Sequence, residues 1–286
     1  MDKILVIGGE GQLGKCLQLA AKNFPEAQFY FKDVARLDIS SKDALEKDFK
    51  AEAYDYCINC AAYTNVEKAE EEEDKAYLIN AYAVENLVAV CNAHHGVLIH
   101  ISTDYVFDGE KKSPYTEDDD TYPINVYGAS KLKGEQLIQE QSQAYFILRT
   151  SWLYSQFGNN FYKTILQKSA ENIDLKITEE QTGTPTNAND LAHAILYLIK
   201  EKKQNYGIYH FSNNGQTTWY GFAQAILNLQ QDSKCTLIAS NAYKTKAARP
   251  KNSVLSKEKF KDVFEFSMVD WEKSLSKLYQ ENFLLK

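Results

Sequence analysis

Apolar residues in the first half of the chain form short continuous runs that alternate with segments of helical periodicity. Residues 4–7 are a continuous, partly β-branched apolar run, as in a buried strand. After the glycines that follow, Leu13 and Leu17 lie four apart, which predicts a helix that ends before Phe24-Pro25. The same alternation predicts further strands over 28–32, 54–60, 97–102 and 145–150, and helices from Ser40-Ser41, over 76–93 and over 127–141.

Strands that alternate with helices predict a parallel sheet, because each right-handed crossover needs a helix to return the chain. The fold class is therefore α/β, a Rossmann-type doubly wound parallel sheet with a smaller α/β domain. Beyond residue 150 the spacing loosens. Helices are predicted there over 161–170, 189–203, 219–229 and 269–279, and short strands over 175–178 and 209–211.

Composition and charge exclude several kinds of protein. With 286 residues, 44% of them apolar, the chain is long enough to bury a full core. The formal net charge of −7 arises from mixed charges without a basic stripe, so we expect no nucleic-acid partner. The apolar run at the amino terminus is far too short to span a membrane. We therefore expect no membrane association and a cytoplasmic protein.

Five cysteines at irregular spacing indicate reduced thiols rather than a disulfide framework. Cys57 and Cys60 are spaced as in a redox motif, but they fall in a predicted strand, where residues three apart point to opposite faces. His94 and His95 have no acidic or cysteine partner at metal spacing. We expect no metal site.

A glycine-rich loop joins the first strand to the first helix. Gly8, Gly11 and Gly14 give the spacing G-x-x-G-x-x-G. Glycine permits a tight turn and lets backbone N–H groups approach a pyrophosphate, whose charge is favoured at a helix N-terminus. The setting between a strand and a helix therefore predicts a dinucleotide site.

Two acidic residues follow at the second predicted strand. Asp33 comes 19 residues after Gly14 (33 − 14), where a carboxylate accepts hydrogen bonds from ribose hydroxyls; its alternative is a solvated loop acid. Lys32 beside it offers a partner for a 2′-phosphate, so the phosphorylation state of the coenzyme stays open. Asp38 falls where such folds place an adenine contact.

These motifs fix a provisional division of the chain. We assign residues 1–150, with returning segments at about 171–210, to a dinucleotide-binding domain. Residues 151–170 and 211–286 are assigned to a smaller substrate-binding domain.

A tyrosine and a lysine at helical spacing are the candidate catalytic groups. Tyr127 and Lys131 lie four apart at the start of a predicted helix and therefore share a face. A lysine in that place stabilises phenolate, which lowers the pKa of the tyrosine toward a useful range. Ser102-Thr103 ends the fourth predicted strand, at the sheet edge where such folds bind ligands.

Taken together, the motifs resemble those of the extended short-chain dehydrogenases, and among them the reductases of nucleotide-activated 4-keto-6-deoxysugars. The resemblance covers nearly the whole chain. Its segments include the glycine loop 8–14, Asn59-Cys60-Ala61-Ala62-Tyr63-Thr64, Ser102-Thr103-Asp104-Tyr105-Val106-Phe107, Tyr127-Gly128-Ala129-Ser130-Lys131, Arg149-Thr150-Ser151-Trp152, Gly183-Thr184-Pro185-Thr186 and Arg249-Pro250.

This resemblance implies reduction of dTDP-4-dehydro-6-deoxy-L-mannose to dTDP-L-rhamnose by NADPH or NADH. It implies that Tyr127 protonates the C4 oxygen, and that Lys131 and Thr103 support it. By the same correspondence, the coenzyme would contact Gln12, Leu13, Ala61, Ala62 and Tyr63, and the sugar nucleotide would contact Thr103, Asp104, Trp152 and Arg249.

Two other functions share this fold. A GDP-sugar epimerase-reductase of the fucose pathway needs an additional cysteine and histidine, and no second pair stands at matching positions. A regulatory subunit that resembles the reductase keeps the fold without turnover, whereas the retained Ser102, Thr103, Tyr127 and Lys131 favour catalysis.

The expected assembly departs from that of some relatives. Some members dimerise through a magnesium ion held by glutamates, one of them just after the glycine loop. Lys15 and Cys16 occupy that place here, and an ammonium repels a hard cation. We expect a monomer or weak homodimer without structural magnesium.

Overall fold

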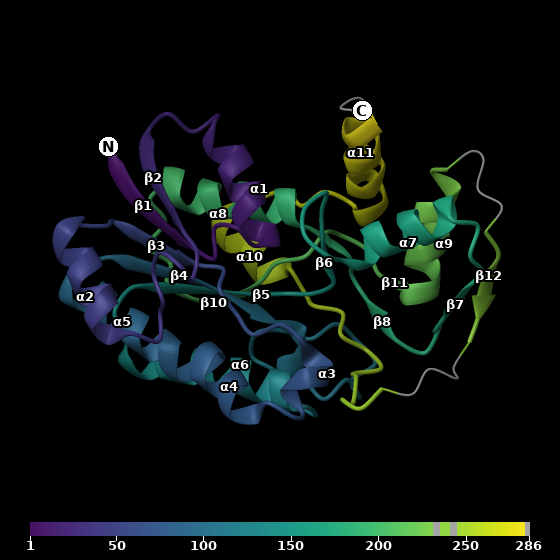
Figure 1. Cartoon of the computed structure of the whole chain (residues 1–286), viewed down its shortest axis with the longest axis horizontal. Coiled ribbons are helices and arrows are strands. Elements are labelled where there is room, and N and C mark those ends of the chain that lie inside the picture. Colours follow the sequence, from purple (N-terminus) through teal and green to yellow (C-terminus); the bar gives the residue numbers. More distant parts are fainter. Residues whose placement is uncertain (231–234, 241–244, 284–286) are drawn as a thin grey trace.

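A parallel six-stranded sheet organises the larger of two bodies (Figure 1). The computed structural model describes residues 1–230, 235–240 and 245–283. Its main sheet has the order β2-β1-β3-β4-β5-β10, and every neighbouring pair is parallel. The strands are β1 (Asp2–Ile7), β2 (Ala27–Lys32), β3 (Tyr56–Asn59), β4 (Val97–Thr103), β5 (Tyr145–Thr150) and β10 (Gly207–His210). The chain order reverses beside β1, which is the point where doubly wound sheets bind ligands.

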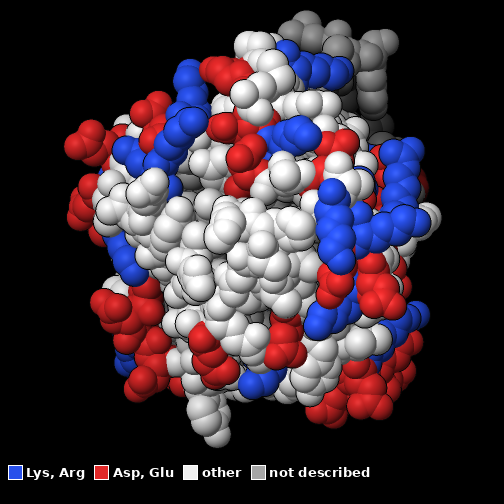
Figure 2. Space-filling model, turned by 90° about the vertical axis from the view of Figure 1, so that its left-hand side faces the viewer, with Lys and Arg blue, Asp and Glu red and all other residues white. Residues whose placement is uncertain are grey.

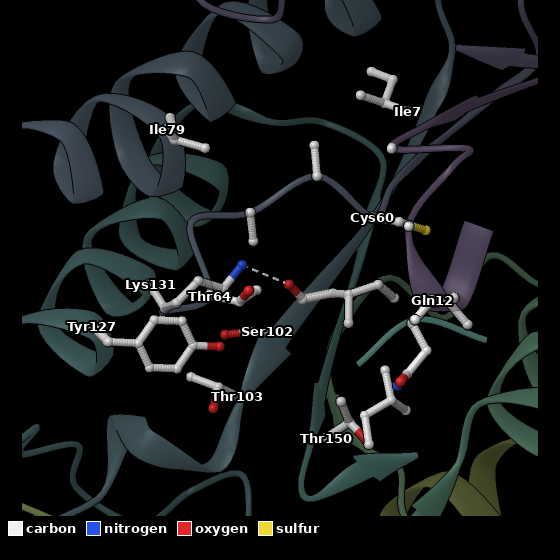
Figure 3. Close-up of a pocket in the computed structure, with 18 of the residues that line it drawn as sticks. Ile7, Gln12, Cys60, Thr64, Ile79, Ser102, Thr103, Tyr127, Lys131 and Thr150 are labelled. Carbon is white, nitrogen blue, oxygen red and sulfur yellow. Dashed lines mark hydrogen bonds between the residues drawn. The ribbon is translucent and has the colours of Figure 1, made fainter. Parts of the chain in front are cut away.

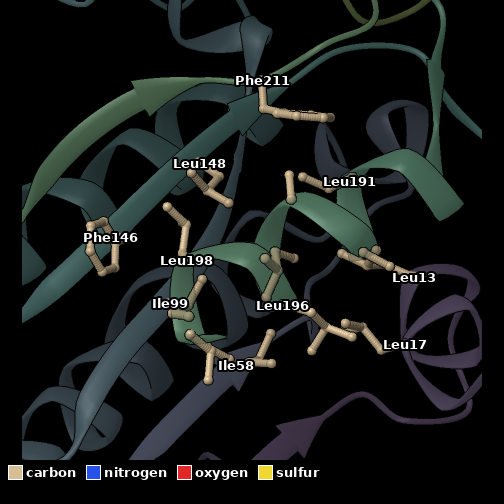
Figure 4. Packing of buried hydrophobic residues seen from close by; sticks show 14 of the residues in the cluster. Leu13, Leu17, Ile58, Ile99, Phe146, Leu148, Leu191, Leu196, Leu198 and Phe211 are labelled. Atoms are coloured by element: carbon tan, nitrogen blue, oxygen red, sulfur yellow. The ribbon is translucent and has the colours of Figure 1, made fainter. Parts of the chain in front are cut away.

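Helices cover both faces of this sheet, as its buried strands require. Along β1, Ile4 and Val6 pack on one side, whereas Leu5 and Ile7 pack on the other. Figure 4 shows the first side, where leucines of two helices meet the central strands. The first face is covered by α1 (Gln12–Ala21), α8 (Ala188–Lys200) and α10 (Glu258–Phe264), and the second by α2 (Lys42–Ala51), α5 (Ala83–Ala93) and α6 (Val126–Gln141).

The smaller body has a core of its own, rich in aromatic rings. Tyr154, Phe222 and Trp271 meet there, with ring centroids 5.1 Å and 5.9 Å apart for the successive pairs. Its elements are β6 (Leu153–Tyr154), α7 (Phe161–Ala170), β7 (Leu175–Ile177), β8 (Thr182–Gly183), β9 (Thr186–Asn187), β11 (Thr217–Thr218), α9 (Trp219–Asn228), β12 (Leu237–Ala239) and α11 (Trp271–Phe283).

The sequence pattern predicts the main elements but not their irregularities. The helix expected over 76–93 is an unbroken succession of α4 (Glu73–Tyr77), a π-helical turn (Leu78–Tyr82) and α5. Inside that turn, buried Asn80 accepts a hydrogen bond from the Tyr63 amide at 2.8 Å and donates to the Ser130 hydroxyl at 3.0 Å. The pattern also misses α10 and α3 (Val66–Ala69), because each is too short to establish a helical period.

The division into two domains stays a prediction, and side-chain packing bears on it in two places. Leu175 of β7, inside the segment assigned to the larger domain, packs in the core of the smaller body. Phe260 and Phe264 of α10, assigned to the smaller domain, pack against the main sheet. If the domains were defined by their cores, β7 would belong to the smaller domain and α10 to the larger one.

Charges of both signs are mixed on the face that Figure 2 shows, where they surround an area without charged side chains.

Among the described residues, no helix is both long and apolar enough to cross a membrane.

The close packing of α6 against the π-helical turn can be tested by substitution at Gly134. A Cβ at Gly134 of α6 would lie 2.2 Å from the Asn80 carbonyl oxygen in the π-helical turn. Helix propensity alone would favour alanine by up to about 1 kcal/mol, but overpacking costs about 1–3 kcal/mol. We expect Gly134→Ala to lower the free energy of unfolding measured in urea, whereas exposed Gln136→Ala on the same helix should change it little. A Gly134→Ala protein as stable as the parent would refute this packing.

Candidate active site

A cleft of about 1010 Å³ lies where the glycine loop, the ends of β3 and β4, the start of α6 and the segment after β5 meet. It brings together most of the residues that the sequence predicts for a site. Those that line it are Gly8, Gly11, Gln12, Leu13, Asp33, Asp38, Ala61, Ala62, Thr103, Asp104, Tyr127, Lys131 and Trp152. Gly14, Tyr63 and Arg249 are not among its lining residues.

The glycine loop forms one end of the cleft. Gly8 has φ +74°, and a Cβ there would lie 2.9 Å from the Ala61 nitrogen. Gly14 is needed for packing, because its Cβ would lie 2.3 Å from the Gly8 carbonyl oxygen. No side chain caps the N-terminus of α1, so its backbone N–H groups remain available to an anion. The loop therefore fits a pyrophosphate.

Asp33 and Asp38 line the same end, and both are held by local backbone. Asp33 Oδ1 accepts from the Arg36 amide at 3.1 Å, and Asp38 Oδ1 accepts from the Ser40 amide at 2.9 Å. Each carboxylate is therefore fixed at the cleft.

The alternative that Lys32 faces this end of the cleft is wrong. Its Nζ donates to the Asp48 carboxylate of α2 and lies 5.8 Å from the centre of the Tyr54 ring. Side chains alternate along a strand, so Lys32 points to the α2 side of the sheet. Of this pair, only Asp33 lines the cleft.

Tyr127 and Lys131 reach the cleft from the first turns of α6. Asn125 begins the helix, because its side chain accepts from the Gly128 amide at 2.8 Å. Figure 3 shows the Tyr127 hydroxyl near the strand end at Ser102, and Lys131 bonded to a backbone carbonyl. That bond runs from Lys131 Nζ to the Ile101 oxygen at 2.7 Å.

The pKa values of the two groups depend on burial. Desolvation raises the pKa of the Tyr127 phenol to about 12, although its hydrogen bond with Thr103 opposes the rise. Desolvation lowers the pKa of Lys131 to about 8, although the charge of Glu135 opposes this. The expected lowering of the phenol pKa is absent while Lys131 bonds Ile101. A phenol that stays protonated at neutral pH suits a proton donor.

A buried ion pair supports this part of the cleft. Arg149 of β5 donates to Glu135 of α6 from Nε at 3.0 Å and from Nη2 at 2.7 Å, and their side chains are 3% and 0% exposed. The Ser102 hydroxyl of β4 also bonds this carboxylate. Sequence reasoning missed the pair. Its signal is an arginine inside an apolar strand, which needs a buried partner.

Asp104 places a second carboxyl group in the cleft. It is 2% exposed, and Oδ1 accepts from the Thr103 hydroxyl at 3.0 Å. Oδ2 has no hydrogen-bond partner among the described residues. Desolvation raises the pKa of Asp104 to about 6, although the Ser253 and Thr103 hydroxyls oppose the rise. This oxygen is positioned to accept from a ligand hydroxyl.

Trp152 contributes to the far wall of the cleft together with Trp219, which sequence reasoning missed. The two indoles are stacked, with centroids 3.7 Å apart and an angle of 11°. A Cβ at Gly183 would lie 2.5 Å from the Trp152 ring. Trp152 therefore packs against both Trp219 and Gly183, and the cleft wall here contains two indoles.

Arg249 is part of a contact between the bodies. Its Nη2 donates to Glu67 Oε1 of α3 at 2.8 Å, and Glu67 Oε2 accepts from the Lys246 amide at 2.8 Å. This ties the segment around Arg249 to the larger body, beside the cleft rather than in its lining.

None of the five cysteines forms a disulfide within the described residues. Within the part of the chain that the structure describes, no group of three or more histidine, cysteine and acidic residues is arranged to hold a metal ion.

The parallel sheet, the glycine loop at its switch point and the Tyr127-Lys131 pair define a coenzyme-binding protein of the extended short-chain dehydrogenase/reductase class. The family model described as the RmlD substrate binding domain matches residues 1–283. The chain belongs to this family.

Relatives and solved structures agree with this assignment along the whole chain. The dTDP-4-dehydrorhamnose reductase of Aggregatibacter actinomycetemcomitans is 35% identical, with 97% of this chain and 98% of the relative covered. That of Escherichia coli strain K12 is 36% identical, with 98% of each covered. The crystal structure of the Bacillus anthracis dTDP-4-dehydrorhamnose reductase in complex with NADP has a TM-score of 0.93 at 36% identity, over 98% of this chain and 99% of that one.

The Asp104 carboxyl group generates a pH prediction. Because its pKa is raised to about 6 in the folded state, the folded protein holds this proton more tightly than the unfolded chain. The contribution of Asp104 to the free energy of unfolding is therefore largest at low pH, and it is lost as the pH rises through about 6. We expect the free energy of unfolding of the parent, relative to Asp104→Asn, to fall by about 1–2 kcal/mol between about pH 4.5 and 7.5. Urea unfolding of both proteins at the two pH values measures this, and a constant difference would contradict it.

Proposed function

We propose that this protein reduces the C4 keto group of dTDP-4-dehydro-6-deoxy-L-mannose with NADPH or NADH and forms dTDP-L-rhamnose. The observation that carries the proposal is the placement of Tyr127, Lys131 and Thr103 in one cleft with a glycine loop. Full-length similarity to dTDP-4-dehydrorhamnose reductases supports the choice of substrate.

The residues present fit a dinucleotide. Gly8 and Gly14 leave room that a Cβ would fill, and the N-terminus of α1 offers free N–H groups to a pyrophosphate. We assign Gly8, Gly11, Gln12, Leu13, Gly14, Asp33, Asp38, Ala61, Ala62, Tyr63, Tyr127 and Lys131 to coenzyme binding. When bound, the coenzyme supplies a hydride to the keto carbon. Gly14 and Tyr63 would act indirectly, through the packing of the loop and the bond from the Tyr63 hydroxyl to Glu72.

Tyr127 is assigned as the general acid. Its phenol is protonated at neutral pH and gives its proton to the oxygen of the reduced carbon, which would otherwise be an alkoxide. Lys131 would bond the ribose next to the nicotinamide and, as an ammonium, stabilise the phenolate left on Tyr127. Thr103 lies beside Tyr127, lowers the pKa of its phenol and would help to orient it. Solvent then restores the proton of Tyr127 before the next turnover.

The opposite wall is assigned to the sugar nucleotide. Asp104 Oδ2 needs a donor, which a sugar hydroxyl supplies. The stacked indoles of Trp152 and Trp219 offer apolar surface to a deoxysugar methyl group. Thr103 completes this set. For Arg249, the bond to Glu67 makes positioning of the neighbouring segment the simpler role.

The cysteine that lines the cleft, Cys60, does not support an epimerase-reductase activity. Desolvation raises the pKa of the Cys60 thiol, so this group is a poor base at neutral pH. We further propose that the enzyme works in the cytoplasm as a monomer or weak homodimer, without structural magnesium.

Turnover of Tyr127→Phe tests the proposed catalytic role. The substitution keeps the ring and removes the proton, so we expect kcat to fall by about 10²-fold or more, with coenzyme affinity little changed. Lys131→Met should lower kcat and also weaken coenzyme binding. The assay follows NAD(P)H absorbance with the dTDP-linked 4-keto sugar and its 3,5-epimerase, and identifies the product. Tyr145→Phe, at the start of β5 and outside the cleft lining, is the control. Parent-like turnover by folded Tyr127→Phe would disprove the assignment.

Coenzyme choice gives a separate test. We expect both NADH and NADPH to be accepted, with a preference smaller than about a thousandfold. Asp33→Asn should shift the ratio of affinities toward NADPH by about tenfold, because a carboxylate repels a 2′-phosphate. Lys32→Met should leave the ratio within about twofold, because Lys32 bonds Asp48. Titration of nucleotide fluorescence measures both, and a larger shift for Lys32→Met would show that Lys32 contacts the coenzyme.

A further inference from the structure

A fully buried histidine lies directly behind Lys131, and the mechanism above gives it no part. His100 of β4 is 0% exposed. Its Nδ1 is 3.1 Å from Asn59 Nδ2, and its Nε2 is 3.1 Å from Lys131 Nζ. The protonation of this imidazole therefore bears on the lysine that the reaction needs.

The neighbours of His100 fix which ring nitrogen carries the proton. The Ala61 amide donates to Asn59 Oδ1 at 3.1 Å, so the NH₂ group of Asn59 must face His100. That NH₂ group donates to Nδ1, which is therefore the acceptor. Burial lowers the pKa of His100 well below its ordinary value, so the ring is neutral and its single proton sits on Nε2.

An Nε2–H directed at Lys131 Nζ favours the amine over the ammonium. An ammonium has only donors, and two donors would then face each other at 3.1 Å. An amine accepts from His100 Nε2 with its lone pair and still donates to the Ile101 oxygen at 2.7 Å. This arrangement satisfies both buried groups.

The second fully buried histidine shows the opposite arrangement. His210 Nδ1 lies 3.1 Å from the Tyr115 carbonyl oxygen, to which it must donate. Its Nε2 is therefore an acceptor, and Arg149 Nη1 lies 3.5 Å from it as a donor. His210, with its proton on Nδ1, can therefore accept a hydrogen bond from the permanent cation Arg149. His100 carries its proton on Nε2 and cannot accept from an ammonium at Lys131.

We propose that His100 is a positioning residue that favours the amine form of Lys131 in the coenzyme-free protein, so that coenzyme binding at mildly alkaline pH is coupled to uptake of a proton by Lys131. The proposal rests on the proposed function. The proton comes from solvent and forms a fourth bond at Nζ, and no group is oxidised or reduced. Lys131 would then donate to ribose hydroxyl oxygens of the coenzyme and act as the ammonium that the reaction requires.

The other titratable groups of the cleft near Lys131 do not change charge between about pH 7 and 9. Asp104, whose pKa is raised to about 6, is largely ionised over that range. Burial raises the pKa of the Cys60 thiol beyond β3, and that of the Tyr127 phenol to about 12. Glu135 is held by Arg149. The pKa of Lys131 is lowered to about 8, so Lys131 is the group of this set expected to change charge between about pH 7 and 9.

Calorimetric titration of the protein with NADPH, in buffers of different ionisation enthalpy, counts the protons taken up. We expect uptake of more than about half a proton per molecule near pH 8.5 in the parent protein. In His100→Gln a carboxamide oxygen can accept from the ammonium, so uptake at that pH should fall to less than about half the parent value. His210→Gln removes an equally buried imidazole away from Lys131 and should leave the uptake as in the parent.

The ¹⁵N NMR spectrum of the coenzyme-free parent tests the tautomer independently of any variant or ligand. We expect a protonated Nε2 and an unprotonated Nδ1 for His100. The inference is overturned by a protonated Nδ1, or by equal proton uptake in the parent and in His100→Gln. If NADPH fails to bind the parent at all, the proposed function fails as well, which distinguishes the two results.

Discussion

The buried contact between Arg149 and Glu135 is the interaction on which the rest of the site depends. It joins β5 to α6 across the carboxyl edge of the sheet, and the Ser102 hydroxyl ties β4 to the same carboxylate. Removing one partner of a buried pair leaves an uncompensated charge that costs about 3–5 kcal/mol. The start of α6, with Tyr127 and Lys131, is thereby fixed relative to the end of β4, with Thr103. A proton donor and its support can keep one geometry without a ligand.

Around this fixed edge, the two bodies supply different surfaces to one cleft. The larger body provides backbone N–H groups and carboxylates, which suit a dinucleotide, and the smaller body provides stacked indoles. A bond from Asn160 to the side chain of Gln12, at 2.8 Å, connects the start of α7 to the start of α1. This bond holds the nucleotide end and the sugar end of the cleft in a fixed relative position. Hydride transfer between two bound molecules requires such a fixed geometry.

The fold follows from the sequence because its signals are local. Apolar runs and helical spacing define the strands and helices of the main sheet, and the glycine loop and the Tyr127-Lys131 spacing mark the cleft. The features that sequence reasoning missed depend on contacts between distant residues. Trp219 meets Trp152, Lys32 turns to Asp48, and Asn80 shapes the π-helical turn through Ser130. Each is set by tertiary packing, for which a periodic pattern carries no information.

In the proposed reaction, C4 of the sugar receives a hydride in this cleft and the C4 oxygen receives a proton. The most direct measurement uses NADPH deuterated at the transferable C4 position of the nicotinamide, with the dTDP-linked 4-keto sugar and its 3,5-epimerase. NMR and mass spectrometry of the product should find one deuterium at C4 of dTDP-L-rhamnose and none at C3 or C5. A product without deuterium at C4, or no product from a folded protein that binds NADPH, would contradict the claim.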